Sequence, residues 1–342
     1  MKKLKAIIIA GGLGTRLRPL TNTTPKPIVP VVNLPFVVHQ IELLARHGVA
    51  EIVLNLHYLS AEIKKVLGDG REWGIKLRYS IEEHPLGTAG AVKNAEEFFG
   101  DELLVIFNGD VLTDFDVSKI AAYHQEKNAL VTLTLTEVED PTAFGLILTD
   151  KDGRVTKFIE KPSWDMVTTH NINAGLYIVD PVIFKQVPKG QPYSFERELY
   201  PSLLEQGAAI YGYPSKDYWL DIGNPLKYKE AHRAILKGDV TGVRVRGKRV
   251  DDCCLVGEDV KMGVGAEIKD CTVLGEHVTV GEHSVLDRTI VWKGTKIGKR
   301  VHLSDCILGY NCVVEDEAFI GRGVVLADGS VVKKATRMSA QG

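Results

Sequence analysis

The chain has 342 residues, of which 44% are hydrophobic and 25% are charged, and its formal net charge at pH 7 is −2. This length and composition suit two domains with cores of their own, and the near-neutral charge argues against a general binder of nucleic acid or of membrane surfaces. No apolar stretch is long enough to span a bilayer, and the five cysteines have no metal-ligand spacing. We therefore expect a cytoplasmic protein with reduced thiols.

The first predicted strand, residues 6–10, runs directly into a loop rich in glycine and positive charge. The loop contains Gly11, Gly12, Gly14, Arg16, Arg18 and Lys26. Glycines let the backbone turn sharply and bring its N–H groups close to an anion, and the basic side chains add charge. The Walker pattern requires Gly-Lys-Ser/Thr, and the dinucleotide pattern requires a small residue where Leu17 stands, so neither familiar phosphate loop fits. Prolines at 19, 25, 27 and 30 keep the chain irregular, which indicates an open cradle for a triphosphate.

Strands and helices then alternate up to about residue 236. Helices are predicted over residues 36–46, 59–67, 88–99, 117–127, 195–206 and 225–236, and strands over 51–56, 76–80, 103–108, 130–136, 145–148, 154–160 and 174–179. This order predicts an α/β fold with a mostly parallel, Rossmann-like sheet and helices on both faces. Asp152-Gly153 predicts a hairpin between two of the later strands.

The last third of the chain is a repeat. An aliphatic residue recurs every six positions, with two slips of five: Val256, Met262, Ile268, Leu274, Val280, Leu286, Val291, Ile297, Leu303, Leu308, Val314, Ile320, Leu326 and Val332. Glycine often follows the aliphatic residue, and a small or aliphatic residue lies four positions after it. This hexapeptide period predicts a left-handed parallel β-helix with three hexads in each coil.

The loop wording Gly-Gly-Leu-Gly-Thr-Arg-Leu-Arg-Pro-Leu-Thr at 11–21, followed by Pro-Lys-Pro at 25–27, resembles the signature of the sugar-1-phosphate nucleotidylyltransferases. Enzymes of this family join a nucleoside triphosphate to a sugar 1-phosphate and release pyrophosphate. The resemblance covers nearly the whole chain. It implies a nucleotidyltransferase catalytic domain over residues 1–237, a linker over 238–252 and the β-helix domain over 253–342.

The resemblance assigns roles in the reaction to four residues. Arg16 is expected to grip the β- and γ-phosphates and to stabilise the leaving pyrophosphate, and Lys26 to contact a phosphate near the reacting centre. Asp110 follows a predicted strand, Asp221 follows Tyr-Trp-Leu, and the resemblance places Mg²⁺ on these two carboxylates. In the alternative interpretation Asp110 only forms a turn and Asp221 only leads into the helix at 225.

The nucleotide contacts implied by the resemblance are Gly11, Gly12, Leu13, Gly14, Thr15, Arg16, Pro85, Gly87, Thr88 and Asp110. Residues 82–90 resemble the loop whose backbone reads the edge of the base. Guanine offers N–H donors that Glu82 or Glu83 could accept, although a solvated glutamate is the more common case. For the sugar phosphate, the resemblance implies contacts from Gly145, Glu160, Lys161 and Asn173. In the alternative interpretation Glu160 and Lys161 form a solvated ion pair, and Asn173 only forms a turn.

Within the family, Pro-Lys-Pro, Glu-Lys-Pro, Asn-Ile-Asn-Ala-Gly and Tyr-Trp-Leu-Asp-Ile-Gly together look most like mannose-1-phosphate guanylyltransferases with a C-terminal β-helix. GTP and mannose 1-phosphate are therefore the expected substrates, and uridylyl or thymidylyl transfer to glucose 1-phosphate is the alternative. Three other classes are disfavoured. A non-catalytic paralogue that binds nucleotide sugars should have lost one of the four residues named above, and all four are present. A nicotinamide dehydrogenase would need a third glycine in the loop, which this chain does not have. An acyltransferase needs a catalytic histidine, for which His277, His283 and His302 are candidates by position alone. The β-helix predicts assembly into a homo-oligomer.

Overall fold

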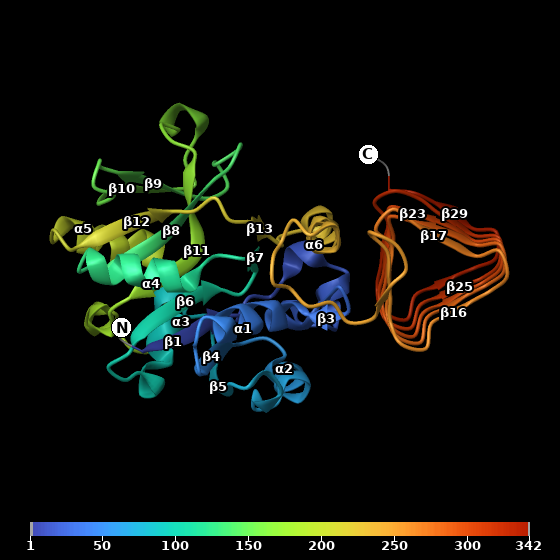
Figure 1. Ribbon diagram of the computed structural model, residues 1–342, viewed down its shortest axis with the longest axis horizontal. Helices are drawn as coiled ribbons and strands as arrows, with labels where there is room; N and C mark the ends of the chain where they lie inside the picture. The colour runs from blue at the N-terminus through green and yellow to red at the C-terminus, as the bar shows by residue number, and fades with distance from the viewer. Residues whose placement is uncertain (1–2, 341–342) are drawn as a thin grey trace. The chain divides into compact units, whose positions relative to one another are not determined.

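The computed structural model describes residues 3–340, and its contacts divide the chain into two compact units (Figure 1). The sheet unit comprises the residues up to Gly12 together with Gln40–Trp219. The β-helix unit comprises Leu13–His39 together with the residues from Leu220 onward. The segment that carries Arg16 and Lys26 thus belongs, by its contacts, with the β-helix rather than with the sheet. The domain boundaries expected at 237 and 252 remain a prediction.

The sheet unit contains a nine-stranded mixed sheet in the order β10-β9-β11-β6-β1-β4-β5, in which β8 pairs with β11 and with β12. Its strands are β1 (Leu4–Ile9), β4 (Glu51–Leu56), β5 (Lys76–Ile81), β6 (Leu103–Asn108), β8 (Val131–Glu137), β9 (Gly145–Thr149), β10 (Val155–Glu160), β11 (Asn171–Val179) and β12 (Ile210–Pro214). The four neighbours β6, β1, β4 and β5 are parallel, as the strand–helix alternation predicts. β11 and its neighbours β6, β8 and β9 run antiparallel, so the α/β fold is confirmed with a mixed rather than a mostly parallel sheet.

Six α-helices are present among the described residues: α1 (Phe36–Arg46), α2 (Ser60–Leu67), α3 (Gly87–Asn94), α4 (Val117–Glu126), α5 (Tyr200–Glu205) and α6 (Pro225–Lys237). Local signals set their ends. The side chain of Asn224 accepts a hydrogen bond from the Lys227 amide at the start of α6, and Gly238 ends this helix with φ of 83°. Within residues 3–340, no helix combines the length and the apolar character required to cross a bilayer.

Short strands complete the fold. β2 (Pro30–Val31) and β3 (Leu34–Pro35) pair as a hairpin. β7 (Val111–Thr113) and β13 (Trp219–Asp221) are two further short strands outside the nine-stranded sheet. The β-helix has three sheets, whose strands are β14 (Lys248–Arg249), β15 (Leu255–Val256), β18 (Val273–Leu274), β21 (Ile290–Val291), β24 (Ile307–Leu308) and β27 (Val325–Leu326); β16 (Lys261–Met262), β19 (Thr279–Val280), β22 (Lys296–Ile297), β25 (Val313–Val314) and β28 (Val331–Val332); and β17 (Glu267–Lys269), β20 (Val285–Asp287), β23 (His302–Ser304), β26 (Phe319–Ile320) and β29 (Arg337–Met338).

The predicted hexads are the strands of these sheets, seen as stacked coils in orange and red in Figure 1. Most of the repeating aliphatic residues are buried in one core, whereas Met262 of the first coil is 41% exposed. Small polar residues four positions later face corner carbonyls. Ser284 donates to the Gly298 oxygen at 2.8 Å and Thr295 to the Gly309 oxygen at 3.0 Å. These bonds satisfy carbonyl groups that the strands leave at the corners.

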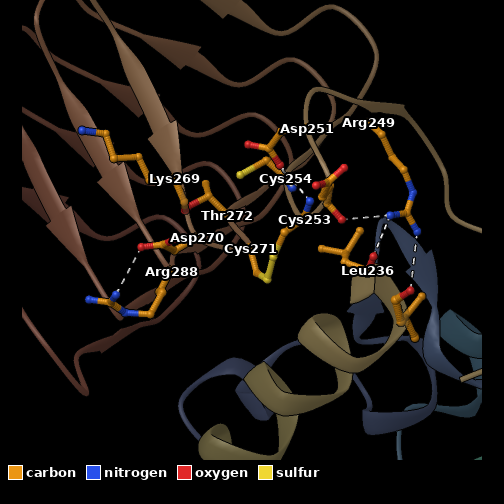
Figure 2. Close-up of a disulfide and its surroundings, with 12 residues drawn as sticks. Leu236, Arg249, Asp251, Cys253, Cys254, Lys269, Asp270, Cys271, Thr272 and Arg288 are labelled. Carbon is orange, nitrogen blue, oxygen red and sulfur yellow. Dashed lines mark hydrogen bonds and ion pairs between the residues drawn. A yellow bond between two sulfur atoms is a disulfide. The ribbon is translucent and has the colours of Figure 1, made fainter. Parts of the chain in front are cut away.

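A disulfide joins Cys253 to Cys271, with their Cα atoms 4.4 Å apart (Figure 2). The expectation of reduced thiols is therefore wrong for these two residues and holds for Cys254, Cys306 and Cys312, which are free and buried. The reason is geometric. The paired strands β15 and β18 are one coil of 18 residues apart, and each cysteine lies two residues before its strand, so stacking superposes them.

Candidate functional site

The carboxyl ends of four parallel strands form one edge of the sheet unit. β1 lies between β6 and β4, and chain order reverses between β1 and β6. In sheets of this kind such a reversal marks the edge where ligands bind. Gly11 follows β1, and Gly109-Asp110 follows β6 beside it. The Gly109 amide donates to the Ile9 oxygen at 2.9 Å, and a Cβ on Gly109 would lie 2.5 Å from that oxygen. Asp110 therefore leaves the sheet next to the start of the glycine loop.

On the other side of β1, the ends of β4 and β5 bring His57 and Glu82 to the same loop. A Cβ on Gly11 would lie 3.5 Å from Cβ of His57 and 3.6 Å from Oε1 of Glu82. Glu82 is only 6% exposed, and its Oε2 accepts a hydrogen bond from the Leu86 amide at 3.1 Å. Burial raises the pKa of its carboxyl group, and the Leu86 amide partly opposes that shift. His57 was not among the predicted residues, although its place directly after an apolar strand is a signal in the sequence.

The predicted base loop is supported by a distant segment, residues 191–196. The Tyr193 oxygen accepts hydrogen bonds from the amides of Ala89 and Gly90, both at 2.9 Å, and so caps the start of α3. Gly87 has φ of 71°, and a Cβ there would lie 2.8 Å from the same oxygen. The glycine at 87 is thus required by close packing, whatever else it contacts.

The side chain of Thr88 is also engaged within the protein. Its hydroxyl donates to Oε2 of Glu196 at 2.9 Å and accepts from the Phe195 amide at 2.9 Å. Pro85, the third predicted residue of this loop, is exposed. Glu196 belongs to a π-helix over Phe195–Leu199 where a regular helix was predicted, and such turns are frequent at functional sites.

In the β-helix unit, the glycine loop folds back on Lys26. Gly14 has φ of 63°, and a Cβ there would lie 3.1 Å from Cβ of Lys26 and 3.2 Å from Cγ2 of Thr21. The Thr21 hydroxyl donates to the Gly14 oxygen at 2.7 Å and holds this turn. Leu13 and Thr15 on either side are exposed. The structure therefore brings Lys26 next to Gly14, as a cradle requires.

Arg16 and Asp221 meet beside Gly223. A Cβ on Gly223 would lie 2.8 Å from Nη1 of Arg16 and 3.1 Å from Oδ2 of Asp221. The sequence gives these residues separate roles, and the structure places the guanidinium and the carboxylate at one point. Room for both depends on the absence of a side chain at 223.

The predicted metal ligands, Asp110 and Asp221, belong to different units of the chain. The described residues hold no cluster of three or more histidine, cysteine, aspartate or glutamate side chains that could cage a metal. Asp110 and Asp221 are both half-buried and offer hard oxygen ligands. Each is a donor of the kind that Mg²⁺ prefers, and this ion usually needs only one or two protein carboxylates.

Three neighbouring strands place the predicted sugar residues at one end of the sheet unit. Gly145 on β9 is paired with Glu160 on β10, and a Cβ at 145 would lie 3.0 Å from Oε2 of Glu160. Burial and the nearby charge of Glu196 raise the pKa of Glu160, while Lys161 and Arg197 oppose the shift. Lys161 has φ of 48°, a left-handed conformation that is uncommon outside glycine and concentrates at functional sites.

Asn173 on β11 lies at an irregularity in the strand. The pairing with β8 shifts register between Asn173 and Tyr177, as in a β-bulge, which re-aims side chains. Nδ2 of Asn173 donates to the Tyr177 hydroxyl at 2.9 Å, and Oδ1 accepts from the Gly175 amide at 3.1 Å. Tyr177 is fully buried, and burial raises its pKa well above the usual value. The sequence pattern did not single out Tyr177 because it reads as part of an apolar strand.

The histidines considered for acyl transfer belong to the architecture of the β-helix. His277 and His283 occupy corners with φ of 58° and 56°. His277 also lies 3.4 Å from the carboxylate of Asp259. His302 stacks on Phe319 one coil away, with ring centroids 5.3 Å apart. These placements support the view that the three are exposed turn and strand residues.

Two family models match the chain. The one described as "Nucleotidyl transferase" matches residues 5–238, and the one described as "GMPPB C-terminal domain" matches residues 243–340. A mannose-1-phosphate guanylyltransferase of Mycobacterium tuberculosis is 34% identical over 296 residues, which cover 86% of this chain and 81% of that protein. A UTP–glucose-1-phosphate uridylyltransferase of Synechocystis is 30% identical over 350 residues, with 93% and 90% covered. Among solved structures, HddC from Yersinia pseudotuberculosis matches with a TM-score of 0.60 and 31% identity, over 69% of this chain and 100% of that chain.

Proposed function

The chain belongs to the nucleotidyl transferase family, and from that premise we propose that it transfers a guanylyl group from GTP to mannose 1-phosphate and releases pyrophosphate. It is an enzyme of sugar-1-phosphate nucleotidyl transfer; GTP and mannose 1-phosphate are the finer proposal. The observation that carries the proposal is the edge of the sheet where Gly11 and Asp110 lie side by side at the reversal of strand order.

The reaction is an in-line attack of one anion on another, so charge must be neutralised and the reacting atoms aligned. We assign Arg16 to the β- and γ-phosphates, where its planar guanidinium suits bidentate contacts with phosphate oxygens. We assign Lys26 to a phosphate near the reacting centre. The packing of Cβ of Lys26 against Gly14 supports this assignment because it places the residue beside the glycine loop.

Asp110 and Asp221 would hold Mg²⁺, which when bound neutralises developing charge on the transferred phosphate. Neither carboxylate acts as an acid or base in this proposal. Arg16, which lies beside Asp221, would orient that carboxylate.

For the sugar phosphate, Glu160 would accept from a sugar hydroxyl, and Lys161 would pair with the phosphate. Asn173, fixed by Tyr177, would contact a second hydroxyl. Gly145 leaves room for the Glu160 carboxylate.

Glu82 is the residue that we propose for base choice. One of its oxygens is held by the Leu86 amide, and the other lies near Gly11. A buried carboxylate accepts but does not donate, so it favours guanine, whose N1–H and N2–H are donors. The uridylyltransferase relative supports a second candidate, transfer of a uridylyl group to glucose 1-phosphate. We further propose a cytoplasmic homo-oligomer that assembles through its β-helix.

A pyrophosphate-release screen tests the proposal. Four nucleoside triphosphates are combined with mannose, glucose and N-acetylglucosamine 1-phosphates, with and without Mg²⁺. We expect the highest turnover for GTP with mannose 1-phosphate and a loss of several orders of magnitude in Asp110→Asn. In Glu82→Gln the preference for GTP over UTP should fall by about tenfold, because one acceptor becomes a donor. Highest turnover with UTP and glucose 1-phosphate would select the second candidate, and near-normal activity of Asp110→Asn would remove the metal assignment.

A further inference from the structure

We propose that the β-helix positions the phosphate-binding segment, and that Trp292, Tyr228, Thr23 and Asp328 are positioning residues of the transfer reaction. The inference rests on the proposed function, since it concerns the segment that carries Arg16 and Lys26. Its starting point is that residues 13–39 group by contacts with the β-helix.

The first contact runs from the β-helix through α6. Trp292 follows β21 and is 2% exposed, and its Nε1 donates to the Tyr228 hydroxyl at 2.9 Å. Tyr228 lies on α6 with no exposed surface, and its hydroxyl donates to the Pro30 oxygen. A relay of two hydrogen bonds thus reaches from a buried tryptophan of the β-helix to the end of the proline-rich segment. Both donors are buried, so loss of either partner leaves an unsatisfied polar group.

The second contact is direct. The Thr23 hydroxyl donates to Oδ2 of Asp328 at 2.5 Å across 305 residues of sequence. Oδ1 of Asp328 accepts from the Tyr310 amide at 2.8 Å, so the carboxylate is itself fixed by the neighbouring coil. Thr23 and Pro30 lie on either side of Lys26. The two contacts therefore hold both ends of the short stretch that presents the lysine.

The third contact stabilises a strained turn. Val32 and Asn33 join β2 to β3 with φ of 45° and 65°, and a β-branched residue rarely adopts such a value. Nδ2 of Asn33 donates to the Leu274 oxygen of the β-helix at 2.9 Å and to the Arg246 oxygen at 3.1 Å. The Val32 amide donates to Nδ1 of His232 on α6 at 3.3 Å.

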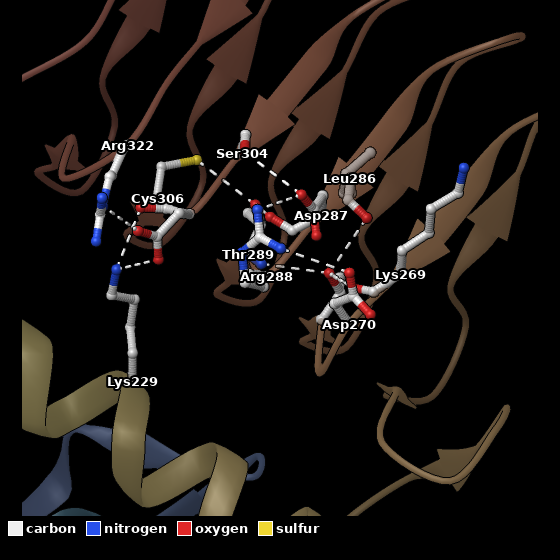
Figure 3. Close-up of polar contacts among 12 residues, drawn as sticks. Lys229, Lys269, Asp270, Leu286, Asp287, Arg288, Thr289, Ser304, Cys306 and Arg322 are labelled. Carbon is white, nitrogen blue, oxygen red and sulfur yellow. Dashed lines mark hydrogen bonds and ion pairs between the residues drawn. The ribbon is translucent and has the colours of Figure 1, made fainter.

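An ion-pair cluster anchors α6 itself. Lys229 contacts the carboxylate of Asp305, and Arg322 lies 3.3 Å from the same carboxylate (Figure 3). Lys229 also donates to the Asp305 main-chain oxygen at 3.3 Å. Since α6 carries both Tyr228 and His232, this cluster fixes the helix through which the β-helix reaches the segment.

These contacts predict a specific phenotype. Tyr228→Phe removes the two hydrogen bonds of the Tyr228 hydroxyl, and Thr23→Val removes the one to Asp328; both leave every proposed substrate contact in place. We expect KM for the nucleoside triphosphate to rise about tenfold to a hundredfold, because a small displacement of positioned groups is enough for such a loss. KM for the sugar phosphate should change less than about threefold. Thr23→Ser keeps the hydroxyl group and should restore the wild-type KM. Trp164→Phe is the matched control, since Trp164 is 59% exposed in the other unit.

Hydrogen exchange of the full-length protein without substrate supplies a readout that does not depend on activity. Amides of residues 20–35 should exchange at least about tenfold faster in Tyr228→Phe and Thr23→Val than in the wild type, while the sheet strands stay protected. Unchanged exchange in both variants overturns the inference, whatever the substrates are. Faster exchange with an unchanged KM also overturns it, because the contacts would then only stabilise the fold. If the wild type transfers no nucleotide at all, the proposed function fails and exchange alone decides whether the β-helix holds this segment.

Discussion

Gly223 lies beside two charged groups, Arg16 and Asp221, so its substitution tests whether their placement matters. In Gly223→Ala the new methyl group would lie 2.8 Å from the Arg16 guanidinium and 3.1 Å from the Asp221 carboxylate. The guanidinium or the carboxylate must therefore move. The substitution adds no backbone strain, because Gly223 does not have a positive φ. We expect kcat to fall at least about tenfold, because misplaced charges stabilise the transition state poorly. Steady-state kinetics of the purified variant measure this.

The same variant should unfold within a few degrees of the wild type, because the methyl group meets only side chains that can relax. A wild-type kcat in Gly223→Ala would show that the geometry of Arg16 and Asp221 does not matter to catalysis. A large fall in the unfolding temperature would instead assign Gly223 to folding.

At the level of single residues, the sequence could nominate groups but not their partners. Arg16, Lys26, Asp110 and Asp221 stand in motifs, so their chemistry can be read without coordinates. Tyr177, Glu196 and His57 lie in segments that look like ordinary strand or helix. Their placement depends on contacts such as Thr88 to Glu196, which join residues 108 positions apart.

His232 makes the stability of α6 depend on acidity. Burial lowers its pKa to about 3 from 6.5, because the folded protein cannot readily accommodate the charged ring. Below pH 6.5 His232 binds a proton in the unfolded chain but stays neutral in the folded chain. The free energy of unfolding therefore decreases as the pH falls from 6.5 toward 3. The loss over that window is roughly 4 to 5 kcal/mol. Urea unfolding of the wild type and of His232→Asn from pH 7 to pH 4 measures it.

His232→Asn keeps an acceptor for the Val32 amide and removes the titration, so its stability should change less with pH. His283→Asn is the control, because His283 is exposed at a corner whose left-handed conformation asparagine tolerates. Parallel pH curves for the wild type and His232→Asn would contradict the assignment.

Among the elements, those with strong periodicity were predicted closely and the others were not. The helix over 36–46 and the strands over 51–56 and 103–108 were predicted with the bounds that the structure has. The helix predicted over 88–99 ends at Asn94 and continues as a 3₁₀ turn over Glu96–Phe98. β12 was missed because Ile210–Pro214 contains glycine and proline, which disfavour strands, and its pairing with β8 overrides that preference.

For the whole molecule, removal of residues 250–342 separates two roles of the β-helix. We expect a lower oligomeric mass, because the coils are the proposed assembly surface. We also expect residual transfer activity with a raised KM for the nucleoside triphosphate, since Trp292 and Asp328 are removed together. Light scattering and kinetics of the truncated protein measure both, and circular dichroism checks that the helices of the sheet unit persist.

An unchanged mass would show that assembly does not run through the β-helix. A lower oligomeric mass with a wild-type KM for the nucleoside triphosphate would show that the β-helix contributes to assembly but does not position the phosphate-binding segment.

The repeat could be read from the sequence at the scale of the whole molecule because its period is local and regular. The grouping of residues 13–39 with residues beyond 219 could not, because no local pattern records contacts such as Thr23 to Asp328. The disulfide could be predicted only in part. Its 18-residue spacing equals one coil, yet the odd number of cysteines pointed toward free thiols.

The span of 305 residues between Thr23 and Asp328 also imposes an order on biosynthesis. The ribosome makes Thr23 early and Asp328 near the close of translation, at about 5 to 20 residues per second. During that interval the nascent chain can complete its sheet but not the contact between Thr23 and the last coils. A product that stops before the last coils therefore lacks the hydrogen bond from Thr23 to Asp328 and keeps only the earlier contacts of the segment.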